Sequence, residues 1–235
     1  WLTQPYHVPP AGQDADYAGY PMLEEEQAMA LFDDAYARGW QVINHVNGDA
    51  AIDQMIRAAR AATEKYGPAD RRTVGIHSQT IRPDQLDAYA ELGIIPSFFG
   101  MHTFYWGDWP RESVLGPERA AFISPARAAL DRGLRYTEHH DAPVALPSSI
   151  MIIATQVNRT TRSGQVLGPD QRVSPMDAIR STTINAAYQY FEEDRKGSIE
   201  PGKLADLVIL DANPLEVPPE ELFDLEVVET IKEGR

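Results

Sequence analysis

The chain has 235 residues, of which 43% are hydrophobic and 24% are charged, and its formal net charge is −14. This length allows a large buried core, and no apolar run is long enough to span a bilayer, so we expect a soluble protein without a membrane partner. The negative charge excludes a nucleic-acid partner, since no cluster of lysine or arginine offsets it.

The chain contains no cysteine. Disulfides, zinc–thiolate sites and cysteine nucleophiles are therefore excluded, which leaves histidine, aspartate and glutamate as metal ligands. The cytoplasm is the default location, and we expect no signal peptide before the first predicted element. Because the chain opens at Trp1 instead of a methionine, we expect it to be a piece of a longer protein.

Residues 1–21 are rich in proline, glycine, tyrosine and aspartate, and they predict an irregular loop that packs on the rest of the chain. Beyond this loop, strands alternate with helices that mostly end at glycine, a pattern typical of βαβ units. The predicted elements are, in order, helix 22–38, strand 40–45, helix 50–66, strand 73–77, helix 84–92, strand 94–98, a long loop, helix 117–131 and strand 134–137.

The last third of the chain predicts two helices and then two short β-type runs. These are helix 148–160, helix 174–191 and the runs 204–210 and 226–232, with a proline-rich loop between the runs. The expected fold class is α/β: a partial TIM-type (β/α) barrel over residues 1–195, followed by a small C-terminal β appendage over residues 196–235.

Histidines are placed unevenly along these elements. A lone histidine at a strand end is usually a polar group satisfied by a neighbouring carbonyl. Five of the six histidines, however, lie at predicted strand ends or in the loops that follow: His45, His77, His102, His139 and His140. In a parallel barrel these positions meet at the carboxyl face, which is where active sites lie. The spacing therefore predicts that the imidazoles converge, together with Asp141.

Imidazole and carboxylate ligands suit zinc or a similar divalent ion. Such an ion lowers the pKa of bound water towards roughly 7. An aspartate beside that water takes its proton and later delivers it to a leaving amine. Asp141 therefore has two predicted roles, metal ligand and catalytic acid–base group.

Several stretches carry a more specific signal, and they cover most of the chain from about residue 40 onward: H-V-N-G-D-A-A-I-D, I-H-S-Q, G-I-I-P-S-F-F-G-M-H-T-F-Y-W-G-D, H-H-D-A-P-V, S-P-M-D-A-I-R-S-T-T-I-N-A-A and G-S-I-E-P-G-K-L-A-D-L-V-I-L-D. Together they resemble the second half of an amidohydrolase of family 3, in the branch similar to N-substituted formamide deformylase. The last stretch is the most specific.

The resemblance implies a zinc-containing barrel that hydrolyses a C–N bond outside peptides, in a small amide or formamide-like substrate. It implies that the chain supplies barrel strands five to eight, and that the C-terminal runs, with Lys203 and Asp206, belong to a composite β-sandwich. The implied metal ligands are His45, His77 and Asp141.

Four further residues are candidates for substrate binding. The resemblance implies that His102 faces the substrate, and the others are His139, His140 and Trp106. Many relatives read G-S-D where this chain reads His139-His140-Asp141, so the two imidazoles either line the pocket, alter metal affinity or fill space. Trp106 is either a packing residue or a platform for the substrate.

The H-x-H pair of the first barrel strand is absent from the 235 residues. The missing amino-terminal half of the barrel, or a second chain, would have to supply it.

Two other functions fit the same pattern. One is a non-catalytic partial barrel that serves oligomerisation or ligand binding, in which the histidines hydrogen-bond to backbone groups. The other is a metal-independent lyase or isomerase, with Asp141 as the base and His102 as the acid. Arg159 either binds a substrate carboxylate or forms a salt bridge on a helix surface.

Overall fold

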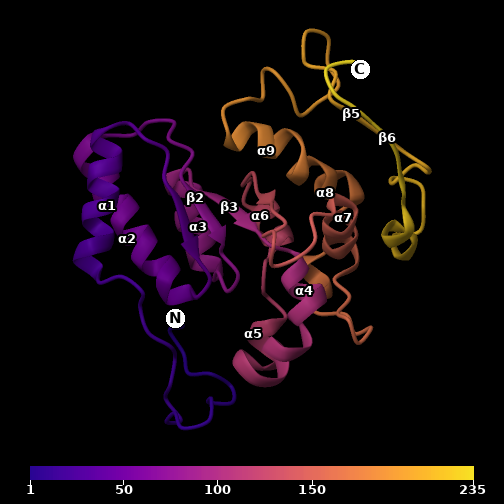
Figure 1. The fold of residues 1–235 in the computed structure, drawn as a ribbon. Helices are drawn as coiled ribbons and strands as arrows, with labels where there is room; N and C mark the ends of the chain where they lie inside the picture. Colours follow the sequence, from indigo (N-terminus) through magenta and orange to yellow (C-terminus); the bar gives the residue numbers. More distant parts are fainter.

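The computed structural model describes residues 1–235, and a parallel sheet of four strands lies at its centre (Figure 1). The strands, in spatial and chain order, are β1 (Ile43–Val46), β2 (Val74–His77), β3 (Ile95–Phe98) and β4 (Thr137–Glu138). Because each pairs in parallel with the next, all four carboxyl ends lie at one edge of the sheet. The predicted α/β class with a parallel sheet is confirmed.

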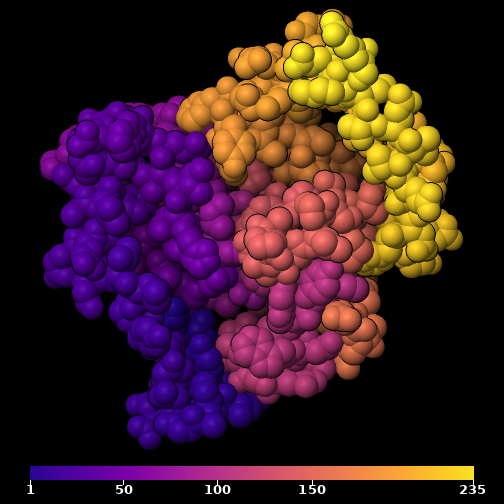
Figure 2. All heavy atoms as spheres, viewed as in Figure 1, coloured from indigo at the N-terminus to yellow at the C-terminus, as the bar shows by residue number.

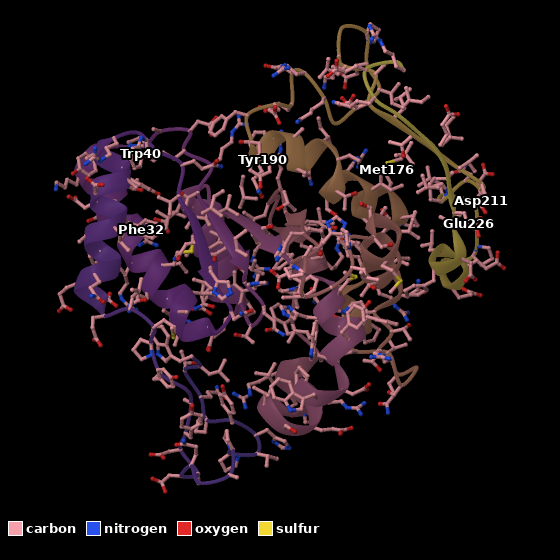
Figure 3. The ribbon with its side chains drawn as sticks, viewed as in Figure 1. Phe32, Trp40, Met176, Tyr190, Asp211 and Glu226 are labelled. Carbon is pink, nitrogen blue, oxygen red and sulfur yellow. The ribbon has the colours of Figure 1, made fainter.

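Helices α1 (Glu25–Ala37), α2 (Asp49–Tyr66) and α3 (Pro83–Leu92) lie beside the first strands, as Figure 1 shows. Helix α2 packs between α1 and α3. Its apolar face enters the main core, where Phe32 of α1 is also buried (Figure 3). The three helices begin and end within three residues of the predicted positions, because their apolar residues recur at helical spacing.

The chain between β3 and β4 is more helical than predicted. It forms α4 (Met101–Trp106), the π-helical turn η1 (Pro110–Val114), α5 (Gly116–Ala120) and α6 (Ala126–Asp131). The prediction of one continuous helix over 117–131 is therefore wrong. Residues 121–125 interrupt it, and among them Ser124 has a φ of +44°. Pro125 follows it, and proline disfavours helical backbone in the preceding residue.

The predicted helix 148–160 is α7 (Ser149–Asn158), and the short helix η2 (Pro169–Gln171) follows it. The predicted helix 174–191 is instead two helices, α8 (Pro175–Thr182) and α9 (Ile184–Gln189). The hydroxyls of Thr182 and Thr183 both donate to the carbonyl of Ile179, at 3.0 and 2.8 Å. These bonds compete with the backbone bonds of the helix, which explains the break at Thr183.

The C-terminal segment forms a separate two-stranded antiparallel sheet of β5 (Leu207–Leu210) and β6 (Val227–Ile231), with the 3₁₀ helix η3 (Pro219–Asp224) between the strands. Asp211 and Glu226 join the two strands where they meet, through a bond of 2.8 Å from the Glu226 N–H to the Asp211 carboxylate (Figure 3). This segment runs along the outside of the molecule (Figure 2). The predicted β appendage is confirmed, whereas its place in a composite sandwich and the boundary at residues 195/196 stay predictions.

No helix of the chain combines the length and the apolar character needed to cross a membrane.

Residues 1–21 contain no helix or strand and pack against the rest of the chain, as predicted. Leu2 is buried in a small cluster with Leu115 and other apolar residues. The Thr3 N–H donates to the Asp49 carboxylate at 2.9 Å. At Gly48, an added Cβ would lie only 1.8 Å from the Trp1 carbonyl oxygen. This close approach holds the start of the chain against the carboxyl end of β1.

We expect Gly48→Ala to displace residues 1–21, because a methyl group cannot fit against the Trp1 backbone. Hydrogen exchange at the Leu2 and His7 amides, which bond to Ala18 and Val114, measures the displacement and should become at least tenfold faster.

Gly39→Ala is the control, because the added methyl at Gly39 meets no atom within 4 Å. It strains a positive φ but should leave the exchange of residues 1–21 unchanged. Equal exchange in both variants would show that the contact with Gly48 does not hold the segment.

Candidate functional site

Four histidines converge at the carboxyl edge of the parallel sheet. His77 ends β2 and lies at the centre, with its ring centroid 4.7 Å from His45 of β1 and 4.8 Å from His139, which follows β4. His102, on α4, lies 5.4 Å from His77. The parallel register produces this convergence, since it brings the ends of separate strands to one place.

The most compact group of possible metal ligands consists of His77, His139 and Asp141. One ligand atom from each lies within 4.8 Å of the others. His77 Nε2 is 4.0 Å from Asp141 Oδ2, and His77 Nδ1 is 3.3 Å from His139 Nε2. Ligand atoms of zinc lie about 2.0–2.2 Å from the ion, so donors a few ångströms apart can share one. Two imidazoles and a carboxylate at this spacing fit a divalent ion.

Two residues of this group have left-handed backbone conformations. The φ of His77 is +68° and that of Asp141 is +54°. Such conformations cost roughly 1–3 kcal/mol in residues with a side chain, and they concentrate at functional sites. The strained backbone sets the direction in which each side chain points. This supports a functional role for both residues.

His45 lies beside the group but outside it. Its side chain is exposed, and its ring meets that of His77 edge-on. Its Nε2 is 3.5 Å from Asn47 Nδ2. His45 also lines a cavity of about 420 Å³ that runs along the free edge of β1 and is mostly apolar.

The other sequence candidates lie on the loops and helices that follow β3 and β4. His102 is half-buried, and its Nδ1 atom is buried without a hydrogen-bond partner. Trp106 lies one helical turn further along α4, with its ring 5.8 Å from that of His102. His140 is outside the compact group, and its Nε2 is 3.4 Å from Ser149 Oγ on α7.

Burial sets the protonation of the central histidines. Burial, together with the nearby imidazoles of His139 and His45, lowers the pKa of His77 to about 4. Burial likewise lowers the pKa of His139 to about 4 and that of His102 to about 3. These three imidazoles are therefore neutral at pH 7, which is the form that binds metals and accepts protons.

Sequence reasoning missed two residues that hold His139 in place. Ser97 of β3 lies with its Oγ 3.2 Å from His139 Nδ1, so it fixes the orientation of the ring. Phe99 is fully buried and stacks on His139, at 5.6 Å between centroids and 27° between planes. A serine within the apolar strand I-P-S-F was the signal that could have indicated the first of them.

Glu138 is a buried carboxyl beside the histidine group, and sequence reasoning missed it as well. It is 8% exposed and accepts the Gly100 N–H at 2.7 Å. An added Cβ at Gly100 would lie 3.0 Å from this carboxylate. Burial raises the pKa of Glu138 to about 8. Glu138 therefore fixes the start of α4, the helix that carries His102.

Arg159 has neither of the two roles considered for it. It is 3% exposed, so it lies on no helix surface. Its guanidinium donates to the carbonyls of Leu167, Ser124 and Ile123, at 2.8, 3.1 and 2.8 Å. Burial lowers its pKa to about 10. Arg159 joins α7 to the segment before α6 and is not free to bind a substrate carboxylate.

Comparisons with known proteins agree with one another. The family described as "Amidohydrolase family" matches residues 1–235. The chain is 32% identical to N-substituted formamide deformylase of Arthrobacter pascens over 81% of the chain and 35% of that protein. It is 30% identical to LONG AFTER FAR-RED 3 of Arabidopsis thaliana over 83% of the chain and 34% of that protein. The chain thus spans about a third of the length of these relatives.

Among solved structures, the chain is similar to an uncharacterized metal-dependent hydrolase from Pyrococcus horikoshii. The TM-score is 0.76 and the sequence identity 26%, over 93% of this chain and 42% of that one.

We expect Glu138→Gln to stabilise the protein, and the gain to grow with pH. The folded state keeps this carboxyl protonated up to a pKa of about 8, whereas the unfolded chain ionises near 4.5. The free energy of unfolding of the wild type therefore falls as pH rises from 4.5 to 8. Glutamine does not ionise, so the variant lacks this fall, and its side-chain oxygen still accepts the Gly100 N–H. Urea unfolding at pH 5 and pH 8 measures the effect.

Glu118→Gln is the matched control, because Glu118 is exposed on α5. It should change the unfolding free energy by less than about 0.5 kcal/mol at either pH. A Glu138→Gln variant that is less stable than the wild type at pH 8 would contradict the role assigned to burial.

Proposed function

Since the chain belongs to the amidohydrolase family, we propose that it forms part of a metal-dependent hydrolase that cleaves a non-peptide carbon–nitrogen bond in a small amide or formamide-like substrate. The observation that carries this proposal is the convergence of His77, His139 and Asp141 at the carboxyl edge of the sheet. The name of the relative from Arthrobacter pascens, a formamide deformylase, supports the bond type.

The proposed ligands for a divalent ion, preferably zinc, fall into two overlapping sets. The family resemblance implies His45, His77 and Asp141. The packing favours His139 in the place of His45, because His139 belongs to the compact group and His45 is exposed beside it. We propose that His77, His139 and Asp141 hold the ion and that His45 is a weaker, additional ligand. A divalent ion supplies Lewis acidity to a carbonyl oxygen and to an attacking water.

The side chains of this chain account for the proton transfers. Asp141 is one-third exposed, so water can reach its carboxylate. We propose that it takes a proton from the attacking water and returns it to the leaving nitrogen. His102 is neutral, and its Nδ1 has no partner within the protein. Because that atom is buried, we propose that a substrate group inserted beside His77 supplies the partner it lacks, while Ser97 and Phe99 keep His139 in position.

Substrate binding is proposed for the residues around this group. Trp106 borders His102 on α4, and His140 lies on the loop between β4 and α7. We propose that these side chains border the place where the carbonyl group of a substrate binds next to His77 and Asp141. Their proposed role is to hold the substrate on the side of β3 and β4.

We also propose that further strands of a barrel, from the same polypeptide or a second chain, cover the free edge of β1. Strands of a parallel sheet are normally buried on both faces. Here Ile43 of β1 is 49% exposed and borders the apolar cavity beside His45. An uncovered edge of this kind exposes backbone groups and apolar surface that a complete barrel would bury.

We expect His77→Ala and His139→Ala each to weaken binding of Co²⁺ or Zn²⁺ at least a hundredfold, because each removes a ligand from the compact group. His45→Ala should weaken binding less, by about tenfold. Visible absorption of Co²⁺, followed by competition with Zn²⁺, measures both affinities at pH 7.5.

His7→Ala is the control, because His7 is exposed and lies outside the cluster. The same proteins are then assayed for release of the amine from simple formamides, with and without a chelator. The function proposed here requires that hydrolysis depend on the metal and on Asp141. Full hydrolysis by a metal-free protein would contradict the role proposed for the metal, and metal-independent conversion without hydrolysis would favour the lyase or isomerase in which Asp141 is the base and His102 the acid. Absence of both metal and hydrolysis, even with the rest of the barrel present, would favour the non-catalytic module.

A further inference from the structure

Two buried threonine hydroxyls, one on α4 and one on α7, have no hydrogen-bond partner within the protein. Thr103 and Thr155 are each 1% exposed. Helix α4 packs against α7 (Figure 1). We propose that at least one ordered water molecule is bound between these helices, where it joins both hydroxyls to the buried carboxyl of Glu138. This water site is independent of the hydrolase function.

The packing of the two helices brings the hydroxyls to the same level. The start of α4 and Ile152 of α7 belong to one buried cluster. At the end of α4, an added Cβ at Gly107 would lie 2.8 Å from the side chain of Thr161, which follows α7. Thr103 and Thr155 lie between these two contacts, one on each helix. Because both side chains are buried, their hydroxyls belong to the interface between α4 and α7.

A helical threonine ordinarily satisfies its hydroxyl within its own helix. Thr63 of α2 does so, since its hydroxyl donates to the Ala59 carbonyl at 2.8 Å. Thr103 and Thr155 have no such bond, although they are more deeply buried than Thr63. A buried hydroxyl without any partner costs free energy, because it has lost its hydrogen bonds to solvent. Two such hydroxyls on facing helices therefore indicate a shared partner from outside the chain.

Glu138 supplies the third polar group. Its Oε2 accepts the Gly100 N–H at 2.7 Å, and its Oε1 has no hydrogen bond within the protein. An added Cβ at Gly100 would lie 3.2 Å from Oε1, so this oxygen lies against the first turn of α4. Thr103 is three residues further along the same helix, and residues at this spacing are neighbours on a helix surface. The carboxyl and the Thr103 hydroxyl are therefore close enough to share a small ligand.

The surrounding charges favour water over an ion. Arg159 is buried one turn beyond Thr155 on α7, and its charge is close enough to interact with Glu138. Its guanidinium nevertheless donates to three carbonyls and not to this carboxyl. A cation would meet the charge of Arg159, and an anion would meet the carboxyl of Glu138. A water molecule is uncharged and needs two to four polar partners, which Thr103, Thr155 and Glu138 provide.

The bound water fixes α4 against its neighbours. Helix α4 has only six residues, so it depends on tertiary contacts and not on its own helical stability. It carries His102 and Trp106. A water that joins α4 to α7 and β4 therefore keeps these two side chains in place.

A double-mutant cycle on the full chain tests the shared water. Thr103→Val and Thr155→Val each replace a hydroxyl by a methyl group of similar size. Each variant loses a hydrogen bond to the water, so each Tm should fall by about 3 °C. The double variant should fall by little more than either single variant, because both substitutions remove the same bridge. Thermal unfolding measures all three values.

Thr230→Val is the control, because Thr230 is exposed on β6. It should change Tm by less than about 1 °C. An unchanged or higher Tm in Thr103→Val or Thr155→Val would overturn the inference, since removing a hydroxyl that has no partner relieves a desolvation cost. Additive losses in the double variant would overturn it as well, because they would show that the two hydroxyls have separate partners.

A high-resolution crystal structure of the full chain is the independent measurement. Density for a water should lie within about 3 Å of both threonine hydroxyls and of the Glu138 carboxyl, and it should be lost in the double variant. Hydroxyls bonded to protein carbonyls, with no density between the helices, would overturn the inference. Equal Tm values in NaCl, KCl and choline chloride would support water. A Tm that depends on which cation is present would instead overturn it in favour of a bound cation.

Discussion

The parallel pairing of β1 to β4 is the constraint on which the rest of the molecule depends. Each strand contributes only two to four residues, yet the common direction of the strands brings residues 45, 77 and 139 to one edge of the sheet. No single segment contains the site. A slip of one residue in the pairing of β2 would turn His77 to the opposite face and separate the group.

The same edge of the sheet holds several buried polar groups, and each has a cost. His77, the protonated Glu138 and the charged Arg159 are buried, and the neutral imidazoles of His102 and His139 are half-buried. Hydrogen bonds offset most of this cost, through Ser97, the Gly100 amide and three carbonyls. His102 Nδ1 stays unpaired. Polar burial of this extent is typical of a region kept for chemistry and not for stability alone.

Much of the fold could be predicted from the sequence because local signals were strong. Helix α2 could be predicted because Ile52, Met55 and Ala59 recur at helical spacing. The ends of α2 and its neighbours could be predicted because glycines follow these helices. The breaks at Ser124 and Thr183 could not be predicted from periodicity, because they depend on a single proline and on threonine hydroxyls. Likewise, the convergence of histidines followed from strand order, but the preference for His139 over His45 in the compact group depended on packing against Phe99.

Gly100 and Glu138 are 38 positions apart in sequence, yet they limit each other. The carboxylate oxygens of Glu138 lie 3.0 and 3.2 Å from the place where the Cβ of a side chain at position 100 would lie, so such a side chain would press on the carboxylate. The two positions are therefore coupled: the effect of a larger residue at 100 depends on whether the residue at 138 can shift or is shorter. Substitutions at the two positions should therefore have effects on stability that do not add.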